Sequence, residues 1–253
     1  MWSFKRDVGS ARLIVVDDRT GRSFHEGRRA IFDEHEWDWV VDACRGDYDH
    51  LLVATTDPVL LAPGLHHAEA WNEAVCDGAW GRRAVALGEK LRRALDFDHW
   101  AAFHVSFKRL MRLLEEIGRG KRGRPPASIV LLSGDVHHAY LAEVAFRRDA
   151  AVESAVYQAV CSPFRNSLDA HERRAVRLAL TRPGQALARA LATAAGAHDP
   201  GVRWRFVEGP YFDNQVATIE LDRRRARMKL EKTIGDPSSD ERRLETVFDR
   251  TLA

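Results

Sequence analysis

The chain has 253 residues, 45% of them hydrophobic, which is enough for one large domain or two small ones. Charged residues make up 30%, yet the formal net charge is only +2, so nucleic acid and anionic membranes are not expected as partners. The first ten residues lack a signal-peptide apolar stretch, and no apolar run reaches about 18 residues, so we expect a soluble, cytoplasmic protein without a membrane span. The odd number of cysteines and their spacing indicate neither structural disulfides nor a zinc finger.

The N-terminal part of the sequence predicts two buried strands separated by a helix. Residues 11–16 (ARLIVV) and 50–54 (HLLVA) are short apolar runs that lead into polar loops. Between them, Asp33 is a suitable helix N-cap, with Glu36 as its capping-box partner. Apolar residues then follow at helical spacing, and Gly46 is expected to end the helix.

The middle of the sequence predicts two further helices. Residues 62–81 are rich in polar groups and are expected to be mostly loop or short helix. A helix is predicted over residues 84–95. Another is predicted from about Asp98, because apolar residues then step by three and four as far as Ile117. A basic linker rich in glycine and proline follows at residues 118–126.

The C-terminal half is predicted to be mainly strands. The clearest is 128–132 (SIVLL); weaker candidates are 140–146, 155–160, 202–207, 216–221 and 228–232. Residues 169–195 are expected to be helical, with a break at Pro183-Gly184, and the last residues to form a charged tail. Strands that alternate with helices, followed by strands of antiparallel character, predict a layered α/β fold.

Three predicted strands end in polar residues. They deliver Asp17-Asp18-Arg19, Thr55-Thr56-Asp57 and Gly134-Asp135-Val136-His137-His138. In layered α/β folds, the carboxyl ends of the strands face the ligand crevice. We therefore expect any site to lie where these three turns meet.

The third turn carries the strongest metal-binding signal. Asp135 and His137 are two residues apart, so in an extended segment both side chains point to one side, and His138 points to the other. His137 is therefore preferred over His138 as a ligand beside Asp135, although a hydrogen-bonded loop is an alternative interpretation. Since a catalytic metal usually takes about three protein ligands, further groups must come from elsewhere in this chain or from another chain.

Several segments, taken together, resemble the PhoD-like alkaline phosphatases of the calcineurin-like metallophosphoesterase superfamily. Residues 128–144 (SIVLLSGDVHHAYLAEV) resemble that family's late metal-binding motif, and residues 13–22 (LIVVDDRTGR) resemble its strand ending in Asp-x-Arg. Residues 97–103 (FDHWAAF) and 156–166 (VYQAVCSPFRN) resemble the segments before its long helix and after its metal turn. The order and spacing agree. The resemblance covers residues 11–235 as a partial domain, with 236–253 as a C-terminal tail.

The resemblance implies a layered metallophosphoesterase-type β-sandwich flanked by helices. It also implies hydrolysis of phosphate mono- or diesters of a phosphorylated small molecule. Two or more metal ions, such as iron, calcium, manganese or zinc, would polarise the phosphoryl group. By the same resemblance, Asp135 and His137 would be metal ligands, and Asp17, Arg19 and Asp98 would be catalytic-site residues.

The resemblance also implies that the family's N-terminal half, with its Gly-Asp and Asp-Asp-His-Glu-type motifs, is missing. Residues 33–36 (DEHE) imitate the second motif but are interpreted as a helix start. We therefore expect this chain alone to be incomplete or inactive, with a complementing N-terminal half or a homodimer as possible partner.

Two alternatives remain open. The chain could be a degenerate, non-catalytic domain that binds a phosphorylated ligand or a protein. Alternatively, His66, His67 and Glu69 could complete a reduced metal site. His99, which borders a predicted helix, is expected to have a structural role.

Overall fold

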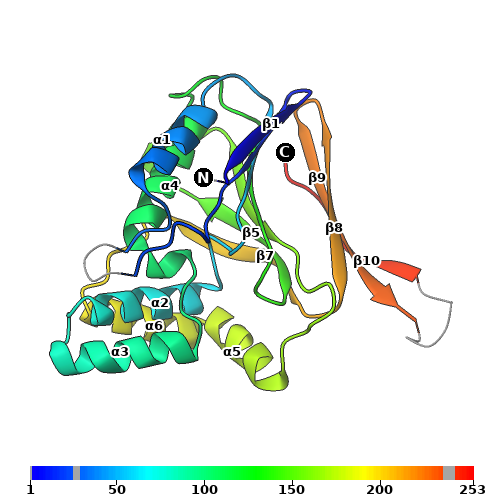
Figure 1. Cartoon of the computed structure of the whole chain (residues 1–253). Coiled ribbons are helices and arrows are strands. Elements are labelled where there is room, and N and C mark those ends of the chain that lie inside the picture. Colours follow the sequence, from blue (N-terminus) through cyan, green and yellow to red (C-terminus); the bar gives the residue numbers. More distant parts are fainter. Residues whose placement is uncertain (1, 25–28, 236–242) are drawn as a thin grey trace.

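A computed structural model describes residues 2–24, 29–235 and 243–253 of the chain. Its main sheet has seven strands in the order β1-β2-β3-β4-β6-β5-β7 (Figure 1). Strands β2, β3, β4 and β6 are parallel, and β1 and β5 are antiparallel to their neighbours. The strands span Phe4–Val8 (β1), Ala11–Val15 (β2), His50–Ala54 (β3), Ser128–Ser133 (β4), Ala139–Ala145 (β5), Ala155–Val160 (β6) and Arg203–Tyr211 (β7).

A second sheet packs on one face of the first. It has three antiparallel strands in the order β10-β9-β8, which span Gln215–Asp222 (β8), Arg225–Ile234 (β9) and Arg243–Thr251 (β10). Val130 and Leu141 of the first sheet share one buried core with Met228, Leu230 and Phe248 of the second. The two sheets therefore form a β-sandwich.

The opposite face of the first sheet is covered by α1 (Glu34–Ala43) and α4 (His104–Gly118). The apolar positions of both helices pack there against strand residues such as Ile14 and Leu131, in the larger core of the molecule. Asp33 caps α1 as expected, because its side chain accepts the N–H of Glu36.

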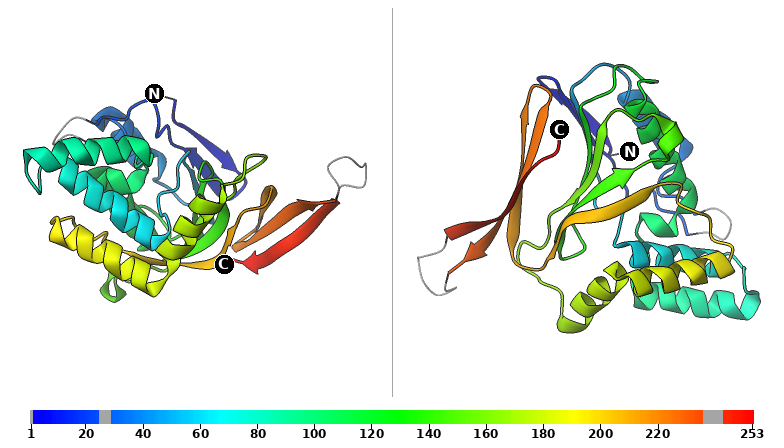
Figure 2. Two further views of the ribbon diagram at one scale, coloured as in Figure 1. Left: turned by 90° about the horizontal axis from the view of Figure 1, so that it is seen from below. Right: turned by 180° about the vertical axis from the view of Figure 1, so that it is seen from behind.

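Four further helices gather into a layer beside the sheet, visible at the bottom of Figure 1 and from other sides in Figure 2. They are α2 (Pro63–Cys76), α3 (Arg82–Ala94), α5 (Ala170–Leu180) and α6 (Arg182–Ala194). No helix in the described ranges is long and apolar enough to cross a membrane.

The predicted mixed α/β class is confirmed, and so are most of the predicted strands. Residues 62–81 contain more helix than expected, because 14 of them form α2. Alpha-helix α4 begins at His104 rather than near Asp98, since Trp100–Ala102 form a separate 3-10 turn. Helix α1 ends at Ala43, before Gly46.

Two edge strands were not predicted. Strand β1 is almost fully exposed and carries three charges, so it lacks the apolar pattern of a buried strand. The predicted tail is also a strand over its described part: β10 pairs with β9, and Phe248 is only 8% exposed. The proposed division at residue 235 therefore falls between two paired strands of one sheet.

The role of β10 can be tested by cavity formation. We expect Phe248→Ala to lower the free energy of unfolding by about 3 kcal/mol, because it empties part of the core between the sheets. Leu244→Ala, on an exposed side chain of the same strand, is the matched control and should change it by less than about 0.5 kcal/mol. Urea unfolding of both variants checks this; equal stability would mean that residues 243–251 are a loose tail.

Candidate metal centre

Three turns at the carboxyl ends of parallel strands meet beside the helical layer. The turn after β2 carries Arg19, the turn after β3 carries Asp57, and the turn after β4 carries Asp135. Arg19 joins them, because its Nη2 atom lies 2.9 Å from Asp57 Oδ1 and 2.8 Å from Asp135 Oδ2. The expectation that the strand ends meet is therefore confirmed.

A buried carboxylate, Asp18, fixes the relative positions of these segments. It is fully buried, and its oxygens accept the N–H groups of Thr56 at 2.9 Å and Asp57 at 3.2 Å. The indole Nε1 of Trp100 donates to it as well, at 3.2 Å. Asp18 thus connects the end of β2 with the turn after β3 and with the segment that carries His99.

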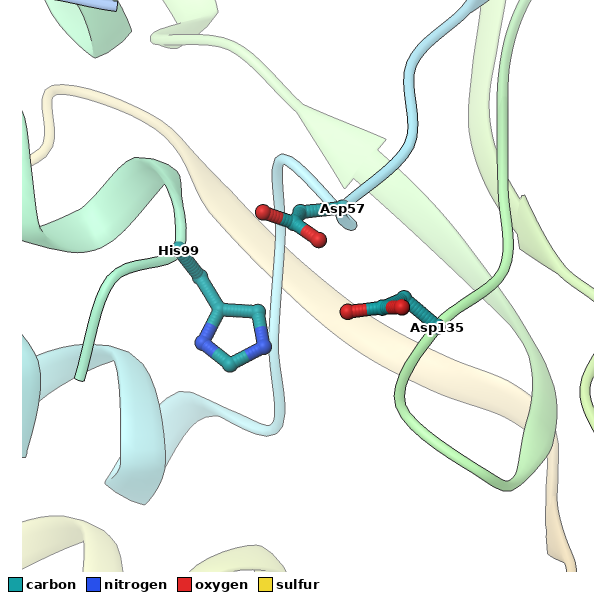
Figure 3. A group of neighbouring side chains, drawn as sticks. All are labelled: Asp57, His99 and Asp135. Atoms are coloured by element: carbon teal, nitrogen blue, oxygen red, sulfur yellow. The ribbon is translucent and has the colours of Figure 1, made fainter. Parts of the chain in front are cut away.

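Asp57, His99 and Asp135 form a group that could hold a metal ion. Each offers one ligand atom, and these atoms lie within 4.8 Å of one another. Figure 3 shows the His99 ring and both carboxylates directed towards a common space. The three residues come from different parts of the chain, so only the fold brings them together.

The ring of His99 is held in place by a contact on the side away from the two aspartates. Its Nδ1 lies 2.7 Å from Oε1 of Glu69, a buried residue of α2. This contact leaves Nε2 facing Asp57 and Asp135 (Figure 3). A carboxylate on the far nitrogen is the usual way in which proteins orient a metal-binding histidine.

Both carboxylates of the group already have cationic partners without a metal. Arg22, with 6% of its side chain exposed, forms ion pairs with Asp57 and with Asp98, the latter at 3.3 Å. Burial raises the pKa of Asp57 to about 6, although Arg22 opposes the shift. For His99, burial lowers the pKa, but Glu69 and the nearby aspartates outweigh it and raise the pKa to about 9.

The donor set nevertheless fits a divalent transition metal. Two carboxylates and one imidazole are suitable ligands, and three protein ligands leave a position open for a substrate. The Arg19 guanidinium forms ion pairs with both carboxylates, so the position between Asp57 and Asp135 favours a cation. Because 43% of its side chain is exposed, Arg19 has room to turn away from the two carboxylates when a metal ion binds. His99 would have to lose its proton to become a ligand.

The sequence-predicted ligand pair is not arranged as expected. Asp135 belongs to the group, but His137 does not, and its Nδ1 lies 2.8 Å from the carbonyl oxygen of Asn166. The expectation of an extended segment is wrong: φ is +66° at Asp135 and +55° at His137. Left-handed residues break the two-residue alternation that would place both side chains on one side. A ligand role for His137 therefore stays a prediction.

The other predicted site residues lie around the group. Arg19 contacts it directly, and Asp98 contacts it through Arg22. Asp17 instead closes its own turn, by accepting the N–H groups of Arg19 at 3.2 Å and Thr20 at 3.0 Å. This is the usual turn-forming role of an aspartate side chain.

Sequence reasoning missed the roles that three residues have in the group and in its support. Asp57 stood at a predicted strand end, which was a usable signal. His99 was interpreted as structural, although it lies between Asp98 and Trp100 in a family-like segment. Glu69 is considered from the sequence only as a ligand beside His66 and His67, whereas in the structure it contacts the His99 ring.

His66 and His67 do not belong to the group either. The His66 ring is buried between aromatic rings, with centroids 4.9 Å from Phe107 and 4.7 Å from Trp204. Glu69 acts on the group only through His99. The reduced site formed by His66, His67 and Glu69 is therefore not assembled in the structure.

A cavity of about 890 Å³ lies away from the group, between the start of α2, helix α6 and the start of β7. None of Asp57, His99 and Asp135 lines it. Two of its arginines already have carboxylate partners: Arg189 pairs with Asp199 at 3.3 Å and Arg147 with Asp149 at 3.5 Å. The metal group, rather than this cavity, is the better candidate for chemistry.

Comparisons with known proteins leave the chain unassigned to a family. No known family model matches the sequence, and no curated protein matches it. A solved structure described as "Structure of PhoD" is similar at a TM-score of 0.48 and 10% identity, over 100% of this chain and 44% of that one. The chain thus spans less than half the length of that structure. A likeness at this level establishes neither fold family nor activity.

Metal titration distinguishes the two possible ligand histidines. We expect Mn²⁺ or Zn²⁺ to bind the purified chain. His99→Gln and Asp135→Asn should weaken binding by at least roughly 10- to 100-fold, because the loss of a residue that only supports a metal ligand already costs that much. His137→Gln is the matched control and should leave the affinity within about twofold. Isothermal titration calorimetry checks this. A loss on His137→Gln but not on His99→Gln would reverse the assignment.

Glu73 of α2 should make stability depend on pH. Burial raises its pKa to about 7, against the lowering by the N–H of His104. Between pH 4.5, the ordinary pKa of a glutamate, and about pH 7, Glu73 keeps its proton in the folded chain but has released it in the unfolded chain. The free energy of unfolding therefore falls as pH rises through this range. In Glu73→Gln, the free energy of unfolding should fall by about 1–3 kcal/mol less over this pH range than in the wild type. Urea unfolding from pH 4.5 to 7.5 measures it, and parallel profiles for the two proteins would contradict it.

Proposed function

We propose that this chain takes part in metal-dependent hydrolysis of phosphate esters, at the group formed by Asp57, His99 and Asp135. The observation that carries the proposal is the convergence of three ligand atoms within 4.8 Å, beside an arginine that bonds both carboxylates. Metal ligands and a guanidinium at one place are what a phosphoryl group requires. The sequence resemblance to PhoD-like phosphatases points to the same chemistry.

The metal would be held by the two carboxylates and by Nε2 of His99. When bound, it would polarise a phosphoryl oxygen and stabilise the charge that develops there. Glu69 keeps the imidazole oriented through its 2.7 Å contact with Nδ1. Arg22 remains buried and holds Asp57 and Asp98 in place.

Arg19 is the residue that we propose to bind the substrate. Its guanidinium is planar and always charged, and it matches the oxygens of a phosphoryl group. It is also partly exposed, whereas Arg22 is buried. A cation bound by Asp57 and Asp135 would free Arg19 from both carboxylates and let it turn towards a phosphate ester.

A complete two-metal site would need further ligands. Among the described residues, the triad is the one group of three or more candidate ligand residues. Two neighbouring ions require more than three protein ligands. We therefore propose that the remaining ligands come from outside the described residues, with a complementing N-terminal half or a second copy of the chain as the source.

A second candidate function is non-catalytic binding of a phosphorylated ligand. This function is favoured by the ion pairs, since Arg19 and Arg22 neutralise Asp57 and Asp135 without any metal. In that case Arg19 would exchange its carboxylate partners for the ligand's phosphate, and no bond would be broken.

Hydrolysis of an aryl phosphate monoester and of an aryl phosphate diester tests the first proposal. With added Mn²⁺ or Zn²⁺ we expect turnover that falls at least roughly 100-fold in Asp135→Asn and His99→Gln. Arg19→Ala should raise KM more than it lowers kcat if Arg19 binds the ground-state phosphate.

A different outcome would favour the second candidate. It requires binding of the non-hydrolysed esters by the metal-free chain, loss of that binding in Arg19→Ala, and no turnover with any metal. Metal-dependent turnover that survives Asp135→Asn would contradict both functions at this site.

A further inference from the structure

Strand β1 lies at one end of the seven-stranded sheet and pairs with β2 on one side. All five of its residues, Phe4-Lys5-Arg6-Asp7-Val8, are exposed. An open strand edge is a template for pairing with another strand. Figure 1 shows the β1–β2 hairpin at the margin of the sheet.

The hydrogen bonds of β2 decide which backbone groups of β1 are free. The N–H of Val16 bonds the carbonyl of Ala54 at 2.9 Å, so even-numbered residues of the β2 segment face β3. Odd-numbered residues therefore face β1, where their register partners are Phe4, Arg6 and Val8. The backbone groups of Lys5 and Asp7 consequently point to the open edge.

We propose that a second copy of the chain pairs with this edge, antiparallel, with β1 against β1 and Arg6 on the two-fold axis. Hydrogen bonding restricts a symmetric pair to three registers, in which Lys5 faces Lys5, Lys5 faces Asp7, or Asp7 faces Asp7. Only the middle register places opposite charges together, and it does so twice. Like charges directly opposite each other destabilise a sheet.

The middle register also extends the existing side-chain rows. Asp7 already accepts from Arg12 of β2 at 2.7 and 2.9 Å. In the dimer it would lie between Arg12 and Lys5 of the partner subunit, which gives an alternating row of charges. On the other face, Phe4 and Val8, which are 49% and 65% exposed, would meet Val8 and Phe4 of the partner subunit.

One contact opposes association. Arg6 would face Arg6 of the partner subunit on the axis, and two like charges there weaken the pair. The strand is also only five residues long. The dimer is therefore reversible: its backbone hydrogen bonds, its two Lys–Asp pairs and its Phe4–Val8 contacts are opposed by one Arg–Arg pair.

Sedimentation velocity over protein concentration tests the charge pattern. Lys5→Asp should weaken the dimer at least tenfold, because it places two aspartates opposite each other. Arg6→Thr should tighten it by roughly tenfold. Arg243→Asp, the same kind of charge change on the exposed edge strand β10, is the matched control and should have no effect.

Disulfide trapping tests the register independently of affinity. Residues on the axis form a non-hydrogen-bonded pair with Cα atoms about 4.5 Å apart, which is within reach of a disulfide. Arg6→Cys should therefore cross-link to itself under mild oxidation. Lys5→Cys and Asp7→Cys should cross-link only when the two variants are mixed.

Two results would overturn the proposal. One is a wild-type chain and an Arg6→Thr variant that both stay monomeric at all concentrations, with circular dichroism showing that both are folded. The other is a dimer that dissociates on Arg243→Asp but not on Lys5→Asp, since another surface would then be responsible.

Discussion

The buried carboxylate of Asp18 is the contact on which the candidate site depends. It receives the N–H groups of Thr56 and Asp57 and the indole N–H of Trp100, so its charge is satisfied inside the protein. Those donors belong to two segments far apart in the sequence. By holding both, Asp18 sets the position of Asp57 and of the chain beside His99. The site is thus assembled around a residue that does not itself belong to the metal group.

Charge balance gives the site two alternative states. Without a metal, Arg19 and Arg22 compensate the carboxylates of Asp57 and Asp135, so the buried carboxylate of Asp57 is not left without a cationic partner. A divalent cation would displace Arg19 and the proton of His99 but not Arg22, since Arg22 is buried and also holds Asp98. The same exchange would release a guanidinium beside the metal. Metal binding and phosphate binding would then be coupled through one side chain.

The sequence predicted the framework of the site better than its ligands. Buried parallel strands have strong apolar runs, and their carboxyl ends must meet at one edge, so the positions of Asp57 and Asp135 followed from pattern and topology. The argument for pairing His137 with Asp135 assumed an extended backbone, which is wrong because both residues have positive φ. No local pattern encodes that the ring of His99 crosses from another segment to meet the two aspartates.

Helix α2 carries polar residues on its buried face. These residues support the candidate site, and they also weaken the sequence pattern by which a helix is predicted. It buries Glu69 and Glu73, which lie four residues apart and therefore on one face of the helix. Glu69 holds the ring of His99, and Glu73 accepts the N–H of His104 at 3.0 and 3.2 Å. Together the two carboxylates fix both ends of the segment that presents His99 to the group. Polar residues on an inward face weaken the amphipathic signal and cost desolvation, as the raised pKa of Glu73 shows. We infer that α2 accepts the desolvation cost of Glu69 and Glu73 because these carboxylates position His99. Sequence periodicity alone cannot reveal such a role.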